Sequence, residues 1–180
     1  MNKEIKIFII SGKSASGKDT TAKFIKEYCH NKGLNCINMQ FSSYIKMYAE
    51  LITEQNINEE TKPRTLLQDL GSIIRENVNK YFFINRIIED IRICSNYTDI
   101  ITISDARLPE ELDIISKEFK NTYKINIIRP NYNTELSNEQ KNHITEIALD
   151  NYHNFDYIII NDGNLKDLYS KIENIIQDII

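Results

Sequence analysis

A glycine-rich stretch near the N-terminus has the residue types and the spacing that bind a polyphosphate. Residues 12–19 read G-K-S-A-S-G-K-D and match the first seven places of the pattern G-x-x-x-x-G-K-[ST]. The two glycines let the backbone curl so that successive N–H groups point at phosphate oxygens. The lysine at place seven, Lys18, reaches the β- and γ-phosphates of a nucleotide, and we expect its ammonium to face solvent until a nucleotide binds. The predicted phosphate-binding residues are Gly12, Lys13, Ser14, Ala15, Ser16, Gly17, Lys18, Asp19 and Thr20.

Two carboxylates are candidates for holding a magnesium ion. Asp19 stands at the eighth place of the pattern, where serine or threonine is expected. It cannot donate a hydrogen bond as a hydroxyl does, but it accepts hydrogen bonds from the waters of a hydrated Mg²⁺. Asp105 comes two residues after the buried run 99–103, the usual place for a metal-binding carboxylate. The alternative for Asp105 is a cap on the helix that follows.

The elements that must position these residues alternate between strand-like and helix-like periodicity. This alternation predicts an α/β fold with a five-stranded, doubly wound parallel sheet and helices on both faces. The predicted strands are 5–11, 35–41, 99–103, 123–128 and 155–160. The predicted helices are 20–32, 44–53, 64–77, 80–94, one from 109, one from about 137 or 143 to 149, and 165–180.

Polar residues follow the end of each predicted strand. In such sheets, the strand ends form the edge at which ligands bind. Arg107 would neutralise charge on a phosphoryl group during transfer, and a surface salt bridge with Glu110 or Glu111 is the alternative. The residues at this edge are Lys18, Ser42, Asp105, Arg107, Arg129, Asn161, Asp162 and Gly163.

A second group of residues suits an acceptor molecule. Arg75 is favoured as a clamp on the acceptor phosphate, whereas Arg64, three helical turns earlier, is more typical of a solvated surface. Phe41, Tyr44 and Tyr48 suit stacking on a base or ribose, although aromatic residues at that spacing more often belong to the core. His143 lies on a short polar stripe suited to helix capping or to nucleotide contact. The predicted acceptor-binding residues are Lys13, Phe41, Tyr44, Arg75, His143 and Glu146.

Length and composition limit the class of protein. The 180 residues fit one domain, and a formal net charge of −4 gives no basic field for nucleic acid. No apolar run reaches the length that spans a bilayer, and the three scattered cysteines form no C-x-x-C pair. We therefore expect a cytoplasmic protein that binds neither nucleic acid nor membrane. The oligomeric state stays open, a homodimer included.

The chain resembles the deoxynucleoside monophosphate kinases of phages and some bacteria, a branch of the P-loop kinases. The animal-type phosphomevalonate kinases are also similar to this chain in several sequence blocks, including the aspartate after the loop lysine. The blocks that carry the resemblance are S-G-K-x-x-S-G-K-D-T at 11–20, L-L-Q-D-L-G at 66–71, S-D-A-R-L-P-E-E at 104–111, I-I-R-P at 127–130, H-I-T-E-I-A-L-D at 143–150 and F-D-Y-I-I-I-N-D-G at 155–163.

The resemblance implies a three-layer P-loop kinase fold and transfer of a phosphoryl group from ATP, with Mg²⁺, to a (deoxy)nucleoside monophosphate. A phosphomevalonate-like acceptor and a regulatory nucleotide-binding protein are the alternatives. The resemblance further implies a substrate-binding helical region at about 42–95, a lid at about 130–142, and residues 161–163 near adenine. The lid departs from that of many monophosphate kinases, because Lys141 is its only cation after Arg129. The residues implied to act in catalysis are Lys18, Asp105, Arg107 and Arg129.

Overall fold

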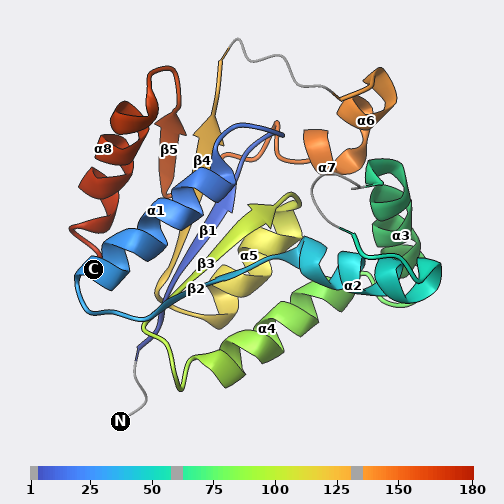
Figure 1. The fold of residues 1–180 in the computed structure, drawn as a ribbon, viewed down its shortest axis with the longest axis horizontal. Coiled ribbons are helices and arrows are strands. Elements are labelled where there is room, and N and C mark those ends of the chain that lie inside the picture. The colour runs from blue at the N-terminus through green and yellow to red at the C-terminus, as the bar shows by residue number, and fades with distance from the viewer. Residues whose placement is uncertain (1–3, 58–62, 131–135) are drawn as a thin grey trace.

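The computed structural model describes residues 4–57, 63–130 and 136–180, and within them a five-stranded parallel sheet forms the centre (Figure 1). Its order is β2-β3-β1-β4-β5, with every neighbouring pair parallel. The predicted α/β class and five-stranded sheet are confirmed. The strands are β1 (Lys6–Ser11), β2 (Cys36–Met39), β3 (Ile100–Ala106), β4 (Thr122–Ile128) and β5 (Tyr157–Ile160).

Helices cover both faces of the sheet, because successive side chains of each buried strand point to opposite faces. From β1, Phe8 and Ile10 pack with α1 (Lys18–Asn31) and α8 (Leu165–Ile176). Ile7 and Ile9 pack on the other face with α4 (Phe82–Cys94) and α5 (Pro109–Glu118). The result is three layers, with apolar cores on either side of the sheet.

The remaining helices gather at the edge of the sheet where the strands end (Figure 1). They are α2 (Phe41–Thr53), α3 (Arg64–Asn77), α6 (Asn138–Asn142) and α7 (Ile144–Ile147). Ser72 of α3 lies 3.4 Å from His143 at the start of α7, which brings these two segments together. None of the helices in the described ranges is long and apolar enough to cross a bilayer.

Three of the differences from the sequence-based boundaries concern the edge of the sheet where the strands end. Phe41 begins α2 rather than ending the second strand, because the Asp105 carboxylate accepts hydrogen bonds from the Phe41 and Ser42 amides, 2.9 Å each. β3 continues through Asp105 to Ala106, which pairs with Ser11. The helix expected up to residue 149 is divided into α6 and α7 at His143. Of the predicted lid, residues 131–135 lie outside the described part of the chain.

Candidate active site

The loop between β1 and α1 adopts the curled form that phosphate binding requires. Gly12 has φ of 141° and Gly17 has φ of 110°, both in the region that favours glycine. A Cβ atom at Gly12 would lie 2.3 Å from the Ile127 carbonyl oxygen, and one at Gly17 would lie 2.9 Å from Asn161 Nδ2. Asn161 Nδ2 also donates to the Ser16 carbonyl oxygen at 2.8 Å. The glycines therefore let the loop rest directly on β4 and on the turn after β5.

Lys18 lies inside the loop rather than in solvent, so the expectation of an exposed ammonium was wrong. Its residue is only 6% exposed, and Nζ donates to the Lys13 carbonyl oxygen at 2.7 Å. Burial is the main reason why the pKa of Lys18 falls to about 7, and the nearby Arg107 charge lowers it further. The curled backbone thus holds the lysine in place before any phosphate arrives.

The two predicted metal-binding carboxylates have different surroundings. Asp19 Oδ1 accepts hydrogen bonds from Ser104 Oγ and from Gln40 Nε2, both at 3.1 Å, while its residue is exposed. Asp105 uses both oxygens on the first amides of α2. Asp105 is therefore a helix cap, as one interpretation allowed, but of α2 rather than of the helix that follows it. Sequence reasoning missed Gln40 and Ser104, whose positions at strand ends were the available signal.

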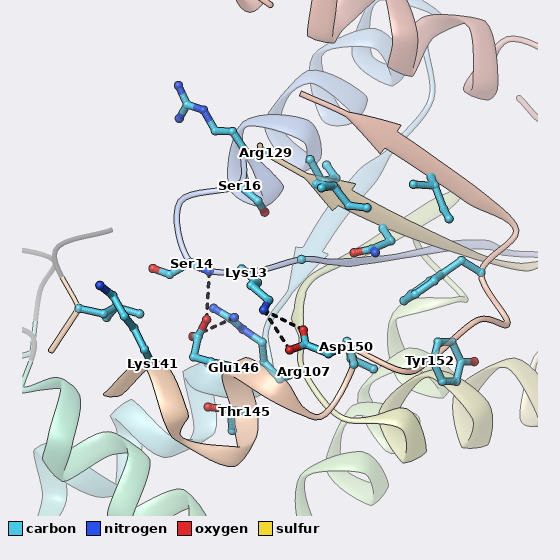
Figure 2. Close-up of a pocket in the computed structure, with 18 of the residues that line it drawn as sticks. Lys13, Ser14, Ser16, Arg107, Arg129, Lys141, Thr145, Glu146, Asp150 and Tyr152 are labelled. Atoms are coloured by element: carbon cyan, nitrogen blue, oxygen red, sulfur yellow. Dashed lines mark hydrogen bonds and ion pairs between the residues drawn. The ribbon is translucent and has the colours of Figure 1, made fainter. Parts of the chain in front are cut away.

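An acidic segment, residues 143–150, lies across the phosphate-binding loop (Figure 2). Glu146 Oε1 pairs with Arg107 Nη1 at 2.9 Å, and its Oε2 accepts the Ser14 amide at 3.1 Å. Asp150 pairs with Lys13 at 2.8 Å. The Arg107 guanidinium therefore pairs with Glu146, and not with either glutamate of the following helix. Carboxylates of this segment thus contact the Ser14 amide, Arg107 and Lys13.

A central cavity of about 650 Å³ connects the loop to α2 and α3. Arg75 of α3 faces this cavity, with its Nη2 3.4 Å from Glu111 Oε1 and its guanidinium 5.0 Å above the Phe83 ring centre. Arg64 also lines the cavity, although its residue is exposed, as the sequence predicted. The cavity thus brings together these predicted residues: Ser14, Ala15, Lys18, Asp19, Phe41, Ser42, Arg64, Arg75, Asp105, Arg107 and Glu146.

A smaller cleft of about 320 Å³ lies on the other side of the loop, toward β5. Arg129 at the end of β4 borders it, and its Nη1 donates to the Ala15 carbonyl oxygen at 3.4 Å. The cleft brings together these predicted residues: Ala15, Gly17, Lys18, Asp19, Thr20, Arg129, Asn161 and Gly163.

Six predicted site residues line neither the central cavity nor this smaller cleft. Three of them, Gly12, Lys13 and Ser16 of the loop, line a further cavity of about 590 Å³, which Glu146 and Asp150 also line. The other three make contacts elsewhere. The Tyr44 hydroxyl donates to Asp90, and the Tyr44 ring packs against the core. His143 caps α7, since its Nδ1 accepts the Thr145 amide at 3.3 Å. Asp162 pairs with Lys171 at 2.7 Å. Phe41 does line the cavity but is a buried member of the core as well.

The five-stranded parallel sheet with this loop after its first strand is the fold of the P-loop kinases. It resembles the APS kinase of Mycobacterium tuberculosis solved with AMPPNP and APS, with a TM-score of 0.58 and 11% identity over 97% of this chain and 98% of that one. It also resembles the shikimate kinase of Aquifex aeolicus, with a TM-score of 0.51 and 12% identity over 96% of each chain.

The chain belongs to the deoxynucleotide monophosphate kinase family, whose model matches residues 27–172. The deoxynucleotide monophosphate kinase of Enterobacteria phage T4 is 31% identical over 122 residues, which are 66% of this chain and 47% of that protein. The chain thus matches about half the length of this relative. Because the family match begins at residue 27, the phosphate-binding loop is assigned by its own pattern and geometry.

Proposed function

We propose that this chain transfers a phosphoryl group from ATP, with Mg²⁺, to a (deoxy)nucleoside monophosphate and releases the two diphosphates. The observation that supports this function best is the central cavity, which joins Lys18 of the loop to Arg75 and Arg107. A donor phosphate on one wall and an acceptor phosphate on the other would meet there. Family membership favours a nucleotide as the acceptor.

The residues around the loop fit a triphosphate and a metal ion. Ser16 Oγ is buried without a hydrogen-bond partner in the described structure, and a ligand oxygen would satisfy it. Asp19 is the residue best suited to hold Mg²⁺, because its carboxylate is exposed and both of its recorded hydrogen bonds end on Oδ1. Asp105 would act on the metal through water, since its oxygens serve α2. Mg²⁺, when bound, neutralises phosphate charge.

The chemistry asks for positioning and charge neutralisation more than for proton transfer. An oxygen of the acceptor phosphate is already an anion, so it attacks the γ-phosphorus without a general base as the bond to the bridging oxygen breaks. Lys18 would hold the β- and γ-phosphates, and Arg107 and Arg129 would neutralise charge on the transferring group. Arg75 would hold the acceptor phosphate across the cavity. We propose a cytoplasmic location, where both nucleotides are found.

Release of ADP tests the function directly. Mg-ATP is incubated alone, with each of the four deoxynucleoside monophosphates, with the ribonucleotides, and with phosphomevalonate. We expect slow hydrolysis with ATP alone and strong stimulation by at least one nucleoside monophosphate. Stimulation by phosphomevalonate alone would move the acceptor to that class, and acceptor-independent hydrolysis would favour a regulatory protein.

The lysine of the loop provides the variant for this assay. Lys18→Ala should lower acceptor-stimulated turnover by at least about 100-fold, the scale of losing one preorganised charge at the reacting group. Lys23→Ala is the matched control, because Lys23 is an exposed lysine on the same helix. Equal turnover of Lys18→Ala and the wild-type protein would remove the loop from the mechanism.

A further inference from the structure

Glu111 is a fully buried carboxylate at the wall of the central cavity. Its residue is 1% exposed, on the first turn of α5. Oε2 accepts the backbone amides of Arg107 and Leu108, at 2.7 and 3.0 Å. Oε1 faces Arg75 Nη2 at 3.4 Å. One side chain therefore contacts both the strand end that carries Arg107 and the helix that carries Arg75.

Arg75 has three neighbours, which are Phe83, Gly71 and Glu111. Its orientation depends on Glu111. The Phe83 ring lies below the guanidinium, and Gly71 leaves space beside it, since a Cβ there would lie 3.2 Å from Arg75 Nη1. Neither contact fixes the rotation of the guanidinium about the ring. The carboxylate of Glu111 does, because a charged hydrogen bond has a preferred direction and is stronger than a neutral one.

Helix capping alone does not explain a buried charge at this position. The two backbone amides need an acceptor oxygen, and a glutamine amide oxygen provides a neutral one that makes weaker hydrogen bonds. Burial penalises the charged carboxylate and raises the pKa of Glu111 to about 7, with the Arg107 amide and the Arg75 charge opposing that rise. Besides stronger hydrogen bonds to the two amides, the carboxylate adds an attraction for Arg75 that an amide lacks.

We propose that Glu111 is a positioning residue that acts on binding of the acceptor phosphate. It fixes the orientation of Arg75 relative to Arg107 across the cavity. This inference rests on the proposed function and deepens it, because it concerns how the acceptor binds. It assigns Glu111 no contact with substrate. Its effect on acceptor binding passes through Arg75.

A double-mutant cycle with Glu111→Gln and Arg75→Met tests the proposal. Glu111→Gln keeps an acceptor for both amides but turns N–H donors toward Arg75, so we expect the acceptor KM to rise about 10-fold, the effect of losing about 1.4 kcal/mol. The KM for ATP should change less than 2-fold. In the Arg75→Met background, Glu111→Gln should add less than a further 2-fold. Glu110→Gln, on the same helical turn but paired with Lys80 at the surface, is the matched control and should leave the acceptor KM unchanged.

Two results would overturn the proposal. Equal rises in the KM values for donor and acceptor, together with a lower melting temperature, would make Glu111 a structural cap only. Additive effects in the double variant would show that Glu111 does not act through Arg75. The same cycle measured as calorimetric binding of each nucleoside monophosphate needs no turnover, so it tests Glu111 even if transfer fails. If the wild-type protein binds a nucleoside monophosphate but transfers no phosphoryl group to it, only the proposed function is rejected. If no monophosphate binds, or if the effects of the Glu111 and Arg75 substitutions on binding are not coupled, the role of Glu111 is rejected.

Discussion

Replacement of Glu146 by glutamine should make ATP bind more tightly. The Glu146 carboxylate accepts the Ser14 amide of the loop and pairs with Arg107, and its side chain is only 10% exposed. Donor phosphates need the loop amides and the cations beside them. The carboxylate and the phosphates therefore compete for the same groups, and binding must first break the contacts of Glu146.

The size of this competition follows from the contacts. A hydrogen bond to a charged acceptor contributes about 1.5–3 kcal/mol, and one between neutral groups contributes about 1 kcal/mol. Glutamine at residue 146 keeps a neutral acceptor for the Ser14 amide and removes the charge that holds Arg107. The difference of about 1.4 kcal/mol corresponds to roughly 10-fold tighter binding.

Isothermal titration with a non-hydrolysable ATP analogue measures the change. Asp150→Asn removes an exposed pair with Lys13, worth about 0–1 kcal/mol, so it should tighten binding by less than about 5-fold. Glu173→Gln, an exposed glutamate on α8, should have no effect. If Glu146→Gln binds the analogue no better than the wild-type protein does, with an unchanged melting temperature, then Glu146 does not compete with phosphate.

Three further predictions concern Lys18, Asp105 and Gly71. The pKa of Lys18 in the folded protein, about 7, lies below its value of 10.5 in the unfolded chain, so the unfolded state binds more protons between these values. The stability of the wild-type protein relative to Lys18→Met should therefore rise from pH 7 to pH 9, as urea midpoints would show; a flat difference would contradict the burial of the ammonium. Asp105→Asn keeps an acceptor oxygen for only one of the two α2 amides and should cost about 1 kcal/mol in the free energy of unfolding by thermal melting, and no loss would mean that the cap does not matter. Gly71→Ala places a Cβ 3.1 Å from Ile45 Cδ1 and 3.2 Å from Arg75 Nη1, so the acceptor KM should rise and the KM for ATP should not; equal values for variant and wild type would show that Arg75 moves freely.

Local sequence patterns predicted the parts of the site that depend on one segment of the chain. The loop at 12–19 has its own spacing rule, and the ends of five parallel strands must meet at one edge. These two facts were enough to gather Lys18, Asp105, Arg107 and Arg129 near one another. The phosphate-binding roles of these arginines stay predictions.

Other parts of the site depend on contacts between distant segments, which no local pattern contains. The burial of Lys18 follows from the closure of the loop on β4 and β5, which Gly12 and Gly17 permit. Phe41 begins a helix because Asp105, 64 residues later, caps it. The Arg75–Glu111 pair joins α3 to α5 across 36 residues, and in the sequence both residues are ordinary charges on helices.

Three cations around the site are each balanced by a carboxylate from another element, and the exposure of those carboxylates sets which pairs a phosphate can replace. The side-chain exposure is 45% for Asp150, 10% for Glu146 and 2% for Glu111. A carboxylate that leaves a pair must be solvated, which costs little at the surface and much more where no water can reach it. Asp150 and Glu146 belong to one acidic segment, so we expect them to leave Lys13 and Arg107 together when phosphates bind. We expect Glu111 to stay, so that Arg75 would meet the acceptor phosphate already oriented.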